Sequence, residues 1–324
     1  SDHFDTSRTM NFLFLESFKF FKNLFIDCDR ACPFSFLLLI TAIYGHGKKP
    51  NPKLSVEIFF RGNQMSKINA VVFDWAGTLI DQGSIAPVVV FKHVFSSENI
   101  EVTLDECRAP MGIAKKQHIA EMLFSQRIKA KFSEVVSREP DSGDVERMYE
   151  TFLRINEDVV LEYVVPIPGA VECFSYLRQQ NIKIGGTTGY GMKLMSQVLP
   201  KAAKLGLEPD TIVCGDELSE ARPSPLMMYQ NFINLNVYPP ETVIKVDDTV
   251  PGIQEGVAAG TLTVGLTLSG NAAGLTKDEF DNLSEASLAD IHKQLSKPFF
   301  DAGADYVLRS ISELPSLIDN LQSK

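Results

Sequence analysis

The run Ile68-Asn69-Ala70-Val71-Val72-Phe73-Asp74-Trp75-Ala76-Gly77-Thr78 carries the strongest structural signal in this chain. Its apolar first half predicts a buried strand, and Gly77 predicts a turn just beyond the strand. The strand therefore delivers Asp74 to its carboxyl end, which is where α/β sheets bind ligands and where an aspartate nucleophile would stand. Two residues later comes Ala76, whose side chain cannot protonate a leaving group.

Four further apolar runs lie at residues 182–185, 211–214, 243–246 and 262–266, and each ends at or next to a glycine, an acid or a hydroxyl residue. Helical patterns separate the runs, so the sequence predicts an α/β fold with a doubly wound parallel sheet, like a Rossmann fold. Between residues 83 and 166 there is no comparable run, and apolar residues recur with helical spacing. We therefore expect a core domain of residues 65–82 and 167–324 with a helical cap domain, 83–166, inserted into it.

The first 64 residues differ in composition from the rest of the chain. They contain 11 of the 22 phenylalanines. Their longest apolar run, from Phe34 to Tyr44, is too short for the roughly 20 residues that span a bilayer, so we expect no stable membrane span. Translated upstream sequence, a targeting segment and a genuine N-terminal extension all remain open for residues 1–64.

Charge and cysteine usage restrict the partners and the compartment. The net charge of −10 argues against nucleic-acid binding, which needs a clustered basic surface. The five cysteines show neither metal-ligand spacing nor a secreted disulfide framework. A reducing compartment follows, so we expect a cytoplasmic protein, with organellar targeting by residues 1–64 as the open alternative.

Four strand ends carry groups that fit phosphoryl transfer. They are Asp74, Thr187-Thr188-Gly189-Tyr190, Arg222-Pro223 and Asp247-Asp248-Thr249. A nucleophilic carboxylate, a hydroxyl and amide cradle, a cation and a second carboxylate are the parts for a covalent aspartyl-phosphate mechanism with Mg²⁺. Because Mg²⁺ prefers oxygen ligands, we expect it on Asp74, the backbone carbonyl of Ala76 and Asp248.

Ala76 leaves three alternatives: an inactive enzyme, a leaving group that needs no proton, or an acid supplied from elsewhere. The segment after Pro110 predicts a helix in which Lys115 and His118, three residues apart, share one face. A lysine amine can condense with a carbonyl substrate, and the resulting iminium accepts electrons. A neighbouring carbon–phosphorus bond can then break to give an enamine, and no acid is needed at position 76.

At residues 67–323 the chain resembles the phosphonoacetaldehyde hydrolase (phosphonatase) family of the haloacid dehalogenase (HAD) superfamily. The matching strings are 72–78 (VFDWAGT), 108–112 (RAPMG) with Lys115 and His118, 182–190 (IKIGGTTGY), 237–240 (VYPP) and 245–252 (KVDDTVPG). The resemblance implies a HAD core, Mg²⁺ and a homodimer. It also implies the roles of individual residues: Asp74 as nucleophile, Lys115 as Schiff-base lysine, Met111 and His118 as supporting groups, and Arg222 as phosphonate ligand.

Three positions depart from the family pattern. Asp247 replaces the glycine that usually precedes the metal aspartate, Ser84 stands where some relatives carry cysteine, and Gly252 stands where some carry an acid. None of these changes removes a group that the mechanism needs. Asp247 is expected to add a negative charge near the metal.

The resemblance implies hydrolysis of a small-molecule phosphonate, phosphonoacetaldehyde, to acetaldehyde and phosphate, within the use of aminoethylphosphonate. The alternative is a HAD phosphatase or dehalogenase in which Lys115 only binds an anion. A catalytically silent scaffold with an interacting N-terminus is a third hypothesis. Retention of Asp74, Arg222 and Asp248 weighs against the third.

Overall fold

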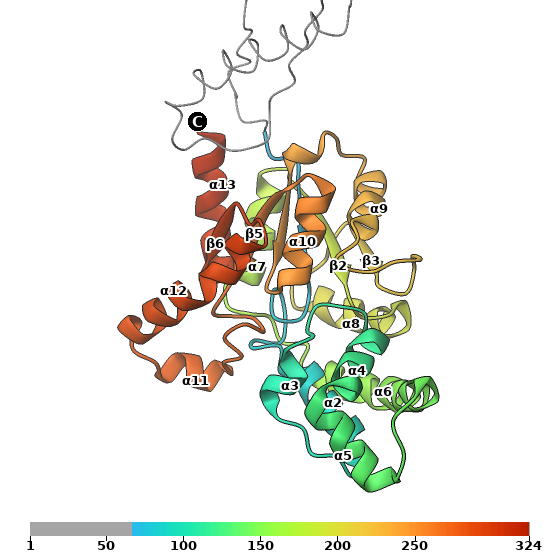
Figure 1. Ribbon diagram of the computed structural model, residues 1–324. Coiled ribbons are helices and arrows are strands. Elements are labelled where there is room, and N and C mark those ends of the chain that lie inside the picture. Colours follow the sequence, from blue (N-terminus) through green and yellow to red (C-terminus); the bar gives the residue numbers. More distant parts are fainter. Residues whose placement is uncertain (1–66, 324) are drawn as a thin grey trace, which may run out of the picture. The chain divides into compact units, whose positions relative to one another are not determined.

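The apolar runs form a six-stranded parallel sheet in the computed structural model, which describes residues 67–323 (Figure 1). The strands are β1 (Ala70–Phe73), β2 (Lys183–Thr188), β3 (Thr211–Cys214), β4 (Val243–Asp247), β5 (Leu262–Leu266) and β6 (Tyr306–Leu308). Their order across the sheet is β3-β2-β1-β4-β5-β6. The order reverses direction between β1 and β4, which is the switch point where doubly wound sheets bind ligands.

The doubly wound sheet predicted from the sequence is confirmed, but the prediction missed β6. This strand has only three residues, and all of them are partly exposed at the edge of the sheet. A run that short gives no usable periodicity, because alternation is read over at least four residues.

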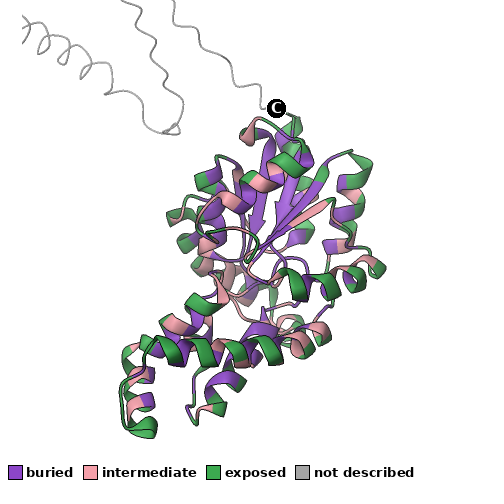
Figure 2. Cartoon of the chain, turned by 90° about the vertical axis from the view of Figure 1, so that its right-hand side faces the viewer, coloured by how far each residue is buried: buried purple, intermediate pink, exposed green. Residues whose placement is uncertain are grey.

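Helices cover both faces of the sheet. On one face lie α7 (Ala170–Gln179), α8 (Met192–Lys204) and α13 (Leu314–Gln322), and on the other lie α9 (Leu226–Leu235), α10 (Val250–Ala259) and α12 (Glu285–Asp301). Strand β1 supplies both faces in alternation: Val71 and Phe73 pack toward α7, while Ala70 and Val72 pack toward α9. Figure 2 shows the sheet as the buried centre of this layer arrangement.

Helix α10 lies unusually close to β4 because two glycines, one turn apart, face the strand. A Cβ atom on Gly256 would lie 2.8 Å from the Cβ of Lys245. A Cβ atom on Gly252 would lie 2.0 Å from the Asp247 carboxyl. The close approach brings the side chains of α10 within reach of groups at the end of β4.

Five helices between β1 and α7 gather beyond the carboxyl ends of the strands (Figure 1). They are α2 (Ile85–Ser97), α3 (Leu104–Arg108), α4 (Lys115–Phe124), α5 (Gln126–Val136) and α6 (Ser142–Glu162). They bury a hydrophobic cluster of their own, which includes Phe91, Phe132 and Phe152. We propose that this cluster is the core of the cap domain expected at residues 83–166.

Helix α4 begins later than the sequence suggested. We predicted a helix opening after Pro110, whereas residues 109–112 form turns and α4 starts at Lys115. Gly112 has φ +99°, a left-handed conformation that a continuous helix does not contain. Lys115 therefore occupies the first helical position, where the helix dipole disfavours a positive charge.

The remaining described elements are α11 (Lys277–Asn282) and the short helical turns η1 (Pro240–Thr242) and η2 (Ile311–Glu313). Among residues 67–323, no helix has both the length and the apolar character needed to cross a membrane. The hypotheses on residues 1–64 concern a segment outside the described part.

Candidate active site

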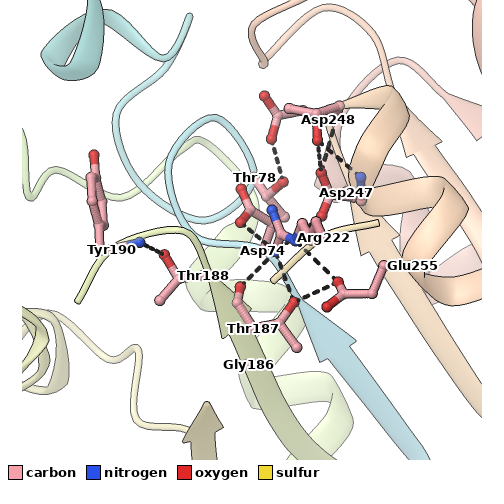
Figure 3. Close-up of polar contacts among 12 residues, drawn as sticks. Asp74, Thr78, Gly186, Thr187, Thr188, Tyr190, Arg222, Asp247, Asp248 and Glu255 are labelled. Atoms are coloured by element: carbon pink, nitrogen blue, oxygen red, sulfur yellow. Dashed lines mark hydrogen bonds and ion pairs between the residues drawn. The ribbon is translucent and has the colours of Figure 1, made fainter. Parts of the chain in front are cut away.

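Asp74 follows β1 directly and lies at the switch point of the sheet. Its backbone N–H donates to the carbonyl of Val246 at 2.9 Å, which fixes the end of β1 against β4. Its buried carboxylate accepts a hydrogen bond from the Arg222 guanidinium at 2.8 Å (Figure 3). The predicted nucleophile and the predicted cation are therefore in contact.

Asp248, which follows β4, is fixed beside Asp74 by three neighbours. The Thr78 hydroxyl donates to its Oδ1 at 2.9 Å, and the backbone N–H of Asn271 donates to its Oδ2 at 2.7 Å. A Cβ atom on Gly77 would lie 2.3 Å from Asp248 Oδ2, and Gly77 has φ +88°. Only glycine satisfies both the turn and the space at this position.

Asp74, Asp247 and Asp248 form a buried carboxylate cluster in which one ligand atom from each lies within 4.8 Å of the others. Burial, followed by repulsion from Asp74 and Asp247, raises the pKa of Asp248 well above its usual value. Burial also raises the pKa of Asp74, although the Arg222 charge opposes the shift. A cation among the three carboxylates would relieve this repulsion, and their hard oxygens suit a divalent metal ion.

Asp247 places the expected extra charge beside the metal-binding residues, and the structure reveals how this charge is balanced. The backbone N–H and hydroxyl of Thr249 donate to Oδ1, while Oδ2 lies 3.1 Å from Lys245 Nζ and 3.3 Å from Arg222. Although burial alone would raise it, the pKa of Asp247 stays below its usual value because of Arg222 and Lys245. The carboxylate fills the space left open by Gly252.

A second buried acid, Glu255 on α10, orients the cations from behind. Its Oε2 accepts hydrogen bonds from Arg222 Nε at 3.0 Å and from the Thr187 hydroxyl at 3.0 Å, and it lies 2.9 Å from Lys245 Nζ. Arg222 Nη2 also donates to the Thr187 carbonyl at 2.9 Å. The guanidinium is thereby fixed with one edge toward Asp74 (Figure 3).

Sequence reasoning missed Lys245 and Glu255, although one signal was present, and it named Thr187 only as part of the loop after the second strand. Lys245 interrupts an apolar run, Val243 to Val246, that was predicted to be a buried strand. A buried lysine almost always has an acidic partner, so the run already called for a buried acid nearby. Which acid it was depended on the packing of α10 on β4.

The formal charges of this buried group do not cancel. Its members are four carboxylates, Asp74, Asp247, Asp248 and Glu255, and two cations, Arg222 and Lys245. With every member ionised, two negative charges are left over. One divalent cation would neutralise them, so the residues present fit the metal ion that the sequence led us to expect.

Above the carboxylates lies a small cleft that is partly open to solvent. Eight predicted site residues line it: Asp74, Ala76, Met111, Lys115, Thr188, Gly189, Tyr190 and Arg222. Ser84, Gly112, Ile113 and Thr249 complete the lining. Residues from the sheet and from the helical insertion thus share one cavity, while Asp248 lies beneath it and His118 behind the insertion wall.

Lys115 projects from the insertion into this cleft between two aromatic rings. Its Nζ lies 5.7 Å from the ring centre of Phe91, 5.6 Å from that of Tyr190 and 3.9 Å from the sulfur of Met111. Burial lowers the pKa of Lys115 to about 8, and Arg222 adds to the effect while Asp74 opposes it. Its place at the start of α4 acts in the same direction, because a helix N-terminus disfavours positive charge.

His118 supports this wall from behind. Its ring stacks on Phe91 with 3.8 Å between centres, and its Nε2 lies 2.9 Å from the carbonyl of Cys107. Because a carbonyl only accepts, we assign the proton to Nε2. Burial and the Lys115 charge lower the pKa of His118 to about 2, so the ring is neutral and is no proton donor near pH 7.

The loop after β2 forms the third side of the cleft. The Thr188 hydroxyl accepts a hydrogen bond from the backbone N–H of Tyr190 at 3.1 Å. The Tyr190 hydroxyl is buried and has no hydrogen-bond partner within residues 67–323. Burial, together with nearby acids such as Asp81, raises its pKa well above the usual value, so the hydroxyl remains neutral.

Comparison with known proteins agrees with this geometry. Residues 71–266 match the sequence profile of the haloacid dehalogenase-like hydrolases. A phosphonoacetaldehyde hydrolase of Bacillus cytotoxicus is 39% identical over 258 residues, which cover 80% of this chain and 98% of that protein. The chain belongs to the phosphonoacetaldehyde hydrolase family of haloacid dehalogenase-like hydrolases. It is therefore a hydrolase.

Two further relatives of this hydrolase are informative. A bifunctional phosphonoacetaldehyde hydrolase/aminoethylphosphonate transaminase of Clostridioides difficile is 40% identical over 258 residues, which cover 80% of this chain and 41% of that protein. The crystal structure of a phosphonoacetaldehyde hydrolase-like protein from Oleispira antarctica has a TM-score of 0.78 and 37% identity, covering 80% of this chain and 94% of that one. The HAD fold predicted from the sequence is thereby confirmed.

Proposed function

We propose that this hydrolase converts phosphonoacetaldehyde and water to acetaldehyde and phosphate. One observation carries the proposal: a single cleft holds the amine of Lys115 and the carboxylate of Asp74 on different walls, while Ala76 beside them offers no acid. An ordinary phosphate ester needs its leaving alkoxide protonated. A carbon leaving group activated through an imine does not.

In the first step the neutral amine of Lys115 adds to the aldehyde carbon, and loss of water gives an imine that is protonated to an iminium. The lowered pKa of about 8 leaves roughly a tenth of the amine neutral at pH 7. Met111, Phe91 and Tyr190 keep water from the amine and fix its direction. His118 supports the Phe91 ring and takes no proton itself.

In the second step an oxygen of Asp74 attacks phosphorus. The carbon–phosphorus bond breaks, and its electron pair moves through carbon to the iminium nitrogen, giving an enamine and an aspartyl-phosphate. Protonation of the enamine carbon and addition of water release acetaldehyde and free Lys115. A second water hydrolyses the aspartyl-phosphate, so that one water is consumed overall.

The phosphonate is assigned to the sheet side of the cleft. Arg222, Thr188 and the Gly189 amide supply donors for its oxygens, and the guanidinium offsets its charge. Mg²⁺ on Asp74, the Ala76 carbonyl and Asp248 would supply the positive charge that lets a carboxylate approach a phosphonate anion. Asp247 completes the carboxylate set that would hold this ion.

Two further assignments belong to the proposal. The transaminase named in the Clostridioides difficile protein supports an aminoethylphosphonate origin for the aldehyde. A homodimer is proposed from the family resemblance alone, and size-exclusion chromatography with light scattering tests it.

The central test is phosphate release from phosphonoacetaldehyde with Mg²⁺, with and without borohydride, followed by mass spectrometry of the peptide containing Lys115. We expect turnover, loss of activity only when substrate and borohydride are both present, and a reduced adduct on Lys115. The matched control is Lys116→Met, because Lys116 is an exposed neighbour paired with Glu146. This variant should be labelled and inactivated like the parent protein.

Hydrolysis of phosphate esters without borohydride sensitivity would favour a phosphatase in which Lys115 binds an anion. Absence of both phosphate and adduct in folded protein with Mg²⁺ would overturn the proposal.

A further inference from the structure

The loop after β5 contacts the metal-binding carboxylates, although its side chains are absent from the predicted catalytic set. In this loop the backbone N–H of Asn271 donates to Asp248 Oδ2 at 2.7 Å. A Cβ atom on Gly270 would lie 2.1 Å from the Cβ of Asp248. The Ser269 hydroxyl donates to the carbonyl of Gly77 at 3.3 Å. The position of this loop therefore fixes the orientation of the Asp248 carboxylate.

The same loop is held from the other side by Arg108, the last residue of α3. Arg108 Nη1 donates to the carbonyl of Gly83 at 2.7 Å and to Asn271 Oδ1 at 3.3 Å, and Nη2 donates to the carbonyl of Gly274 at 3.3 Å. In return, Asn271 Nδ2 donates to the carbonyl of Arg108 at 3.4 Å. Arg108 and Asn271 thus form a reciprocal pair between the helical insertion and the sheet side.

The fit around Arg108 is tight. A Cβ atom on Gly274 would lie 2.7 Å from the centre of the Arg108 guanidinium, and Gly274 has φ +61°. The guanidinium is partly buried and carries its charge at every ordinary pH. Because partial burial removes water from its donors, the three oxygen acceptors of the loop and of Gly83 replace part of the lost hydration.

We propose that Arg108 and Asn271 act as a clasp that couples closure of the insertion to metal binding at Asp248. They are positioning residues, since neither lines the cleft. When the insertion is closed, Arg108 holds the loop after β5 against Asp248. The loop then fixes the Asp248 carboxylate in the orientation that binds the ion. Coupling between two equilibria is reciprocal, so a metal ion at Asp248 also favours the closed insertion, which carries Lys115.

This inference rests on the metal site of the proposed function, and the test separates the two. Isothermal titration with Mg²⁺ alone, without substrate, is carried out on the parent protein, on Arg108→Gln, on Asn271→Ala and on the double variant. Asn271→Ala retains the backbone N–H that binds Asp248, so it removes only the clasp. Each single change should weaken Mg²⁺ binding about fivefold, within the usual range of coupling effects.

The double variant should bind Mg²⁺ no more weakly than the weaker single variant, because either change opens the same clasp. Arg127→Gln is the matched control. Arg127 lies on α5 and pairs with Glu106, which shares helix α3 with Arg108 but makes no contact with the loop after β5. It should leave Mg²⁺ binding unchanged. Thermal unfolding in the presence of a chelator confirms that each variant is folded.

A second readout is independent of affinity. Mg²⁺ should slow amide hydrogen exchange in α3 and α4 of the parent protein, and Asn271→Ala should remove this protection. Unchanged Mg²⁺ affinity in both single variants, or additive losses in the double variant, would overturn the clasp. Failure of the parent protein to bind Mg²⁺ would instead overturn the proposed metal site.

Discussion

The two walls of the cleft treat charge in opposite ways. The sheet wall gathers four buried carboxylates and two buried cations: ion pairs link the cations to Asp74, Asp247 and Glu255, and Asp248 lies beside Asp74 and Asp247. The insertion wall presents one amine, on Lys115, to two aromatic rings and a thioether. Arg222 and Lys245 stabilise the carboxylates with which they pair on the first wall, whereas loss of water without an ionic partner destabilises the charge on the second.

This difference suits two tasks that share one reaction. A phosphorus-attacking carboxylate has to be ionised, and Arg222 opposes the rise in the pKa of Asp74 that burial causes. An imine-forming lysine has to be neutral, and burial lowers the pKa of Lys115 to about 8. Placing the two groups on separate elements lets each have its own electrostatic surroundings.

The largest expected effect comes from removing one reactive group from either wall. Asp74→Asn should lower phosphate release by about 10⁴-fold or more, as expected for loss of a nucleophile, yet Lys115 should still be labelled by borohydride with substrate. Lys115→Met should lose both phosphate release and labelling by borohydride. Single-turnover assays and mass spectrometry measure these outcomes. Loss of labelling in a folded Asp74→Asn protein would contradict the separation of the two walls.

Next in size is the stability of the sheet wall. Lys245→Met leaves Asp247 and Glu255 with Arg222 as their one remaining buried cation, and breaking buried pairs in this way costs about 3–5 kcal/mol. Urea unfolding measures the change in free energy. Lys116→Met removes an equal charge from the exposed surface of the insertion and should stay within about 0.5 kcal/mol of the parent protein. Equal losses of unfolding free energy in the two variants would contradict the difference between the buried and the exposed lysine.

A smaller effect is expected at the contact between β4 and α10. Gly252→Ala places a methyl group 2.0 Å from the Asp247 carboxyl, which has to move away from Lys245 and Arg222. Overpacking of this kind costs about 1–3 kcal/mol of stability. Urea unfolding again provides the measurement, and Mg²⁺ titration should reveal weaker binding. An unchanged affinity would mean that Asp247 does not contribute to the metal site.

On the insertion wall, a change in the ionisation of Lys115 should have a smaller effect still. Because the neutral amine reacts, kcat/KM of the parent protein should rise as pH increases through about 8, the pKa of Lys115. Met111→Glu sets a carboxylate beside Nζ and should raise that pKa by about one unit, costing roughly tenfold in kcat/KM at pH 7. Met111→Leu should leave the profile in place. A profile unaffected by Met111→Glu would indicate that Lys115 ionisation does not limit the reaction.

Much of the fold could be predicted from the pattern of apolar residues along the chain. Five strands were predicted close to their observed bounds because buried parallel strands are continuous apolar runs, which stand out from the helices between them. The sixth strand, Tyr306–Leu308, and the start of α4 were missed or misplaced. Short edge strands and turns depend on neighbours that one segment does not reveal.

The order of amino acids along the chain already reveals the reactive groups: Asp74 at a strand end, Ala76 where an acid would stand, and a lysine in a helical insertion. Which charges are paired, through Lys245 and Glu255, and how Lys115 loses its water between Phe91 and Tyr190 follow from the packing of distant segments. The difference arises because the two kinds of interaction act over different separations along the chain. Strand and turn preferences act over a few neighbouring residues, whereas the pKa of a buried group depends on charges brought within a few ångströms from distant parts of the chain.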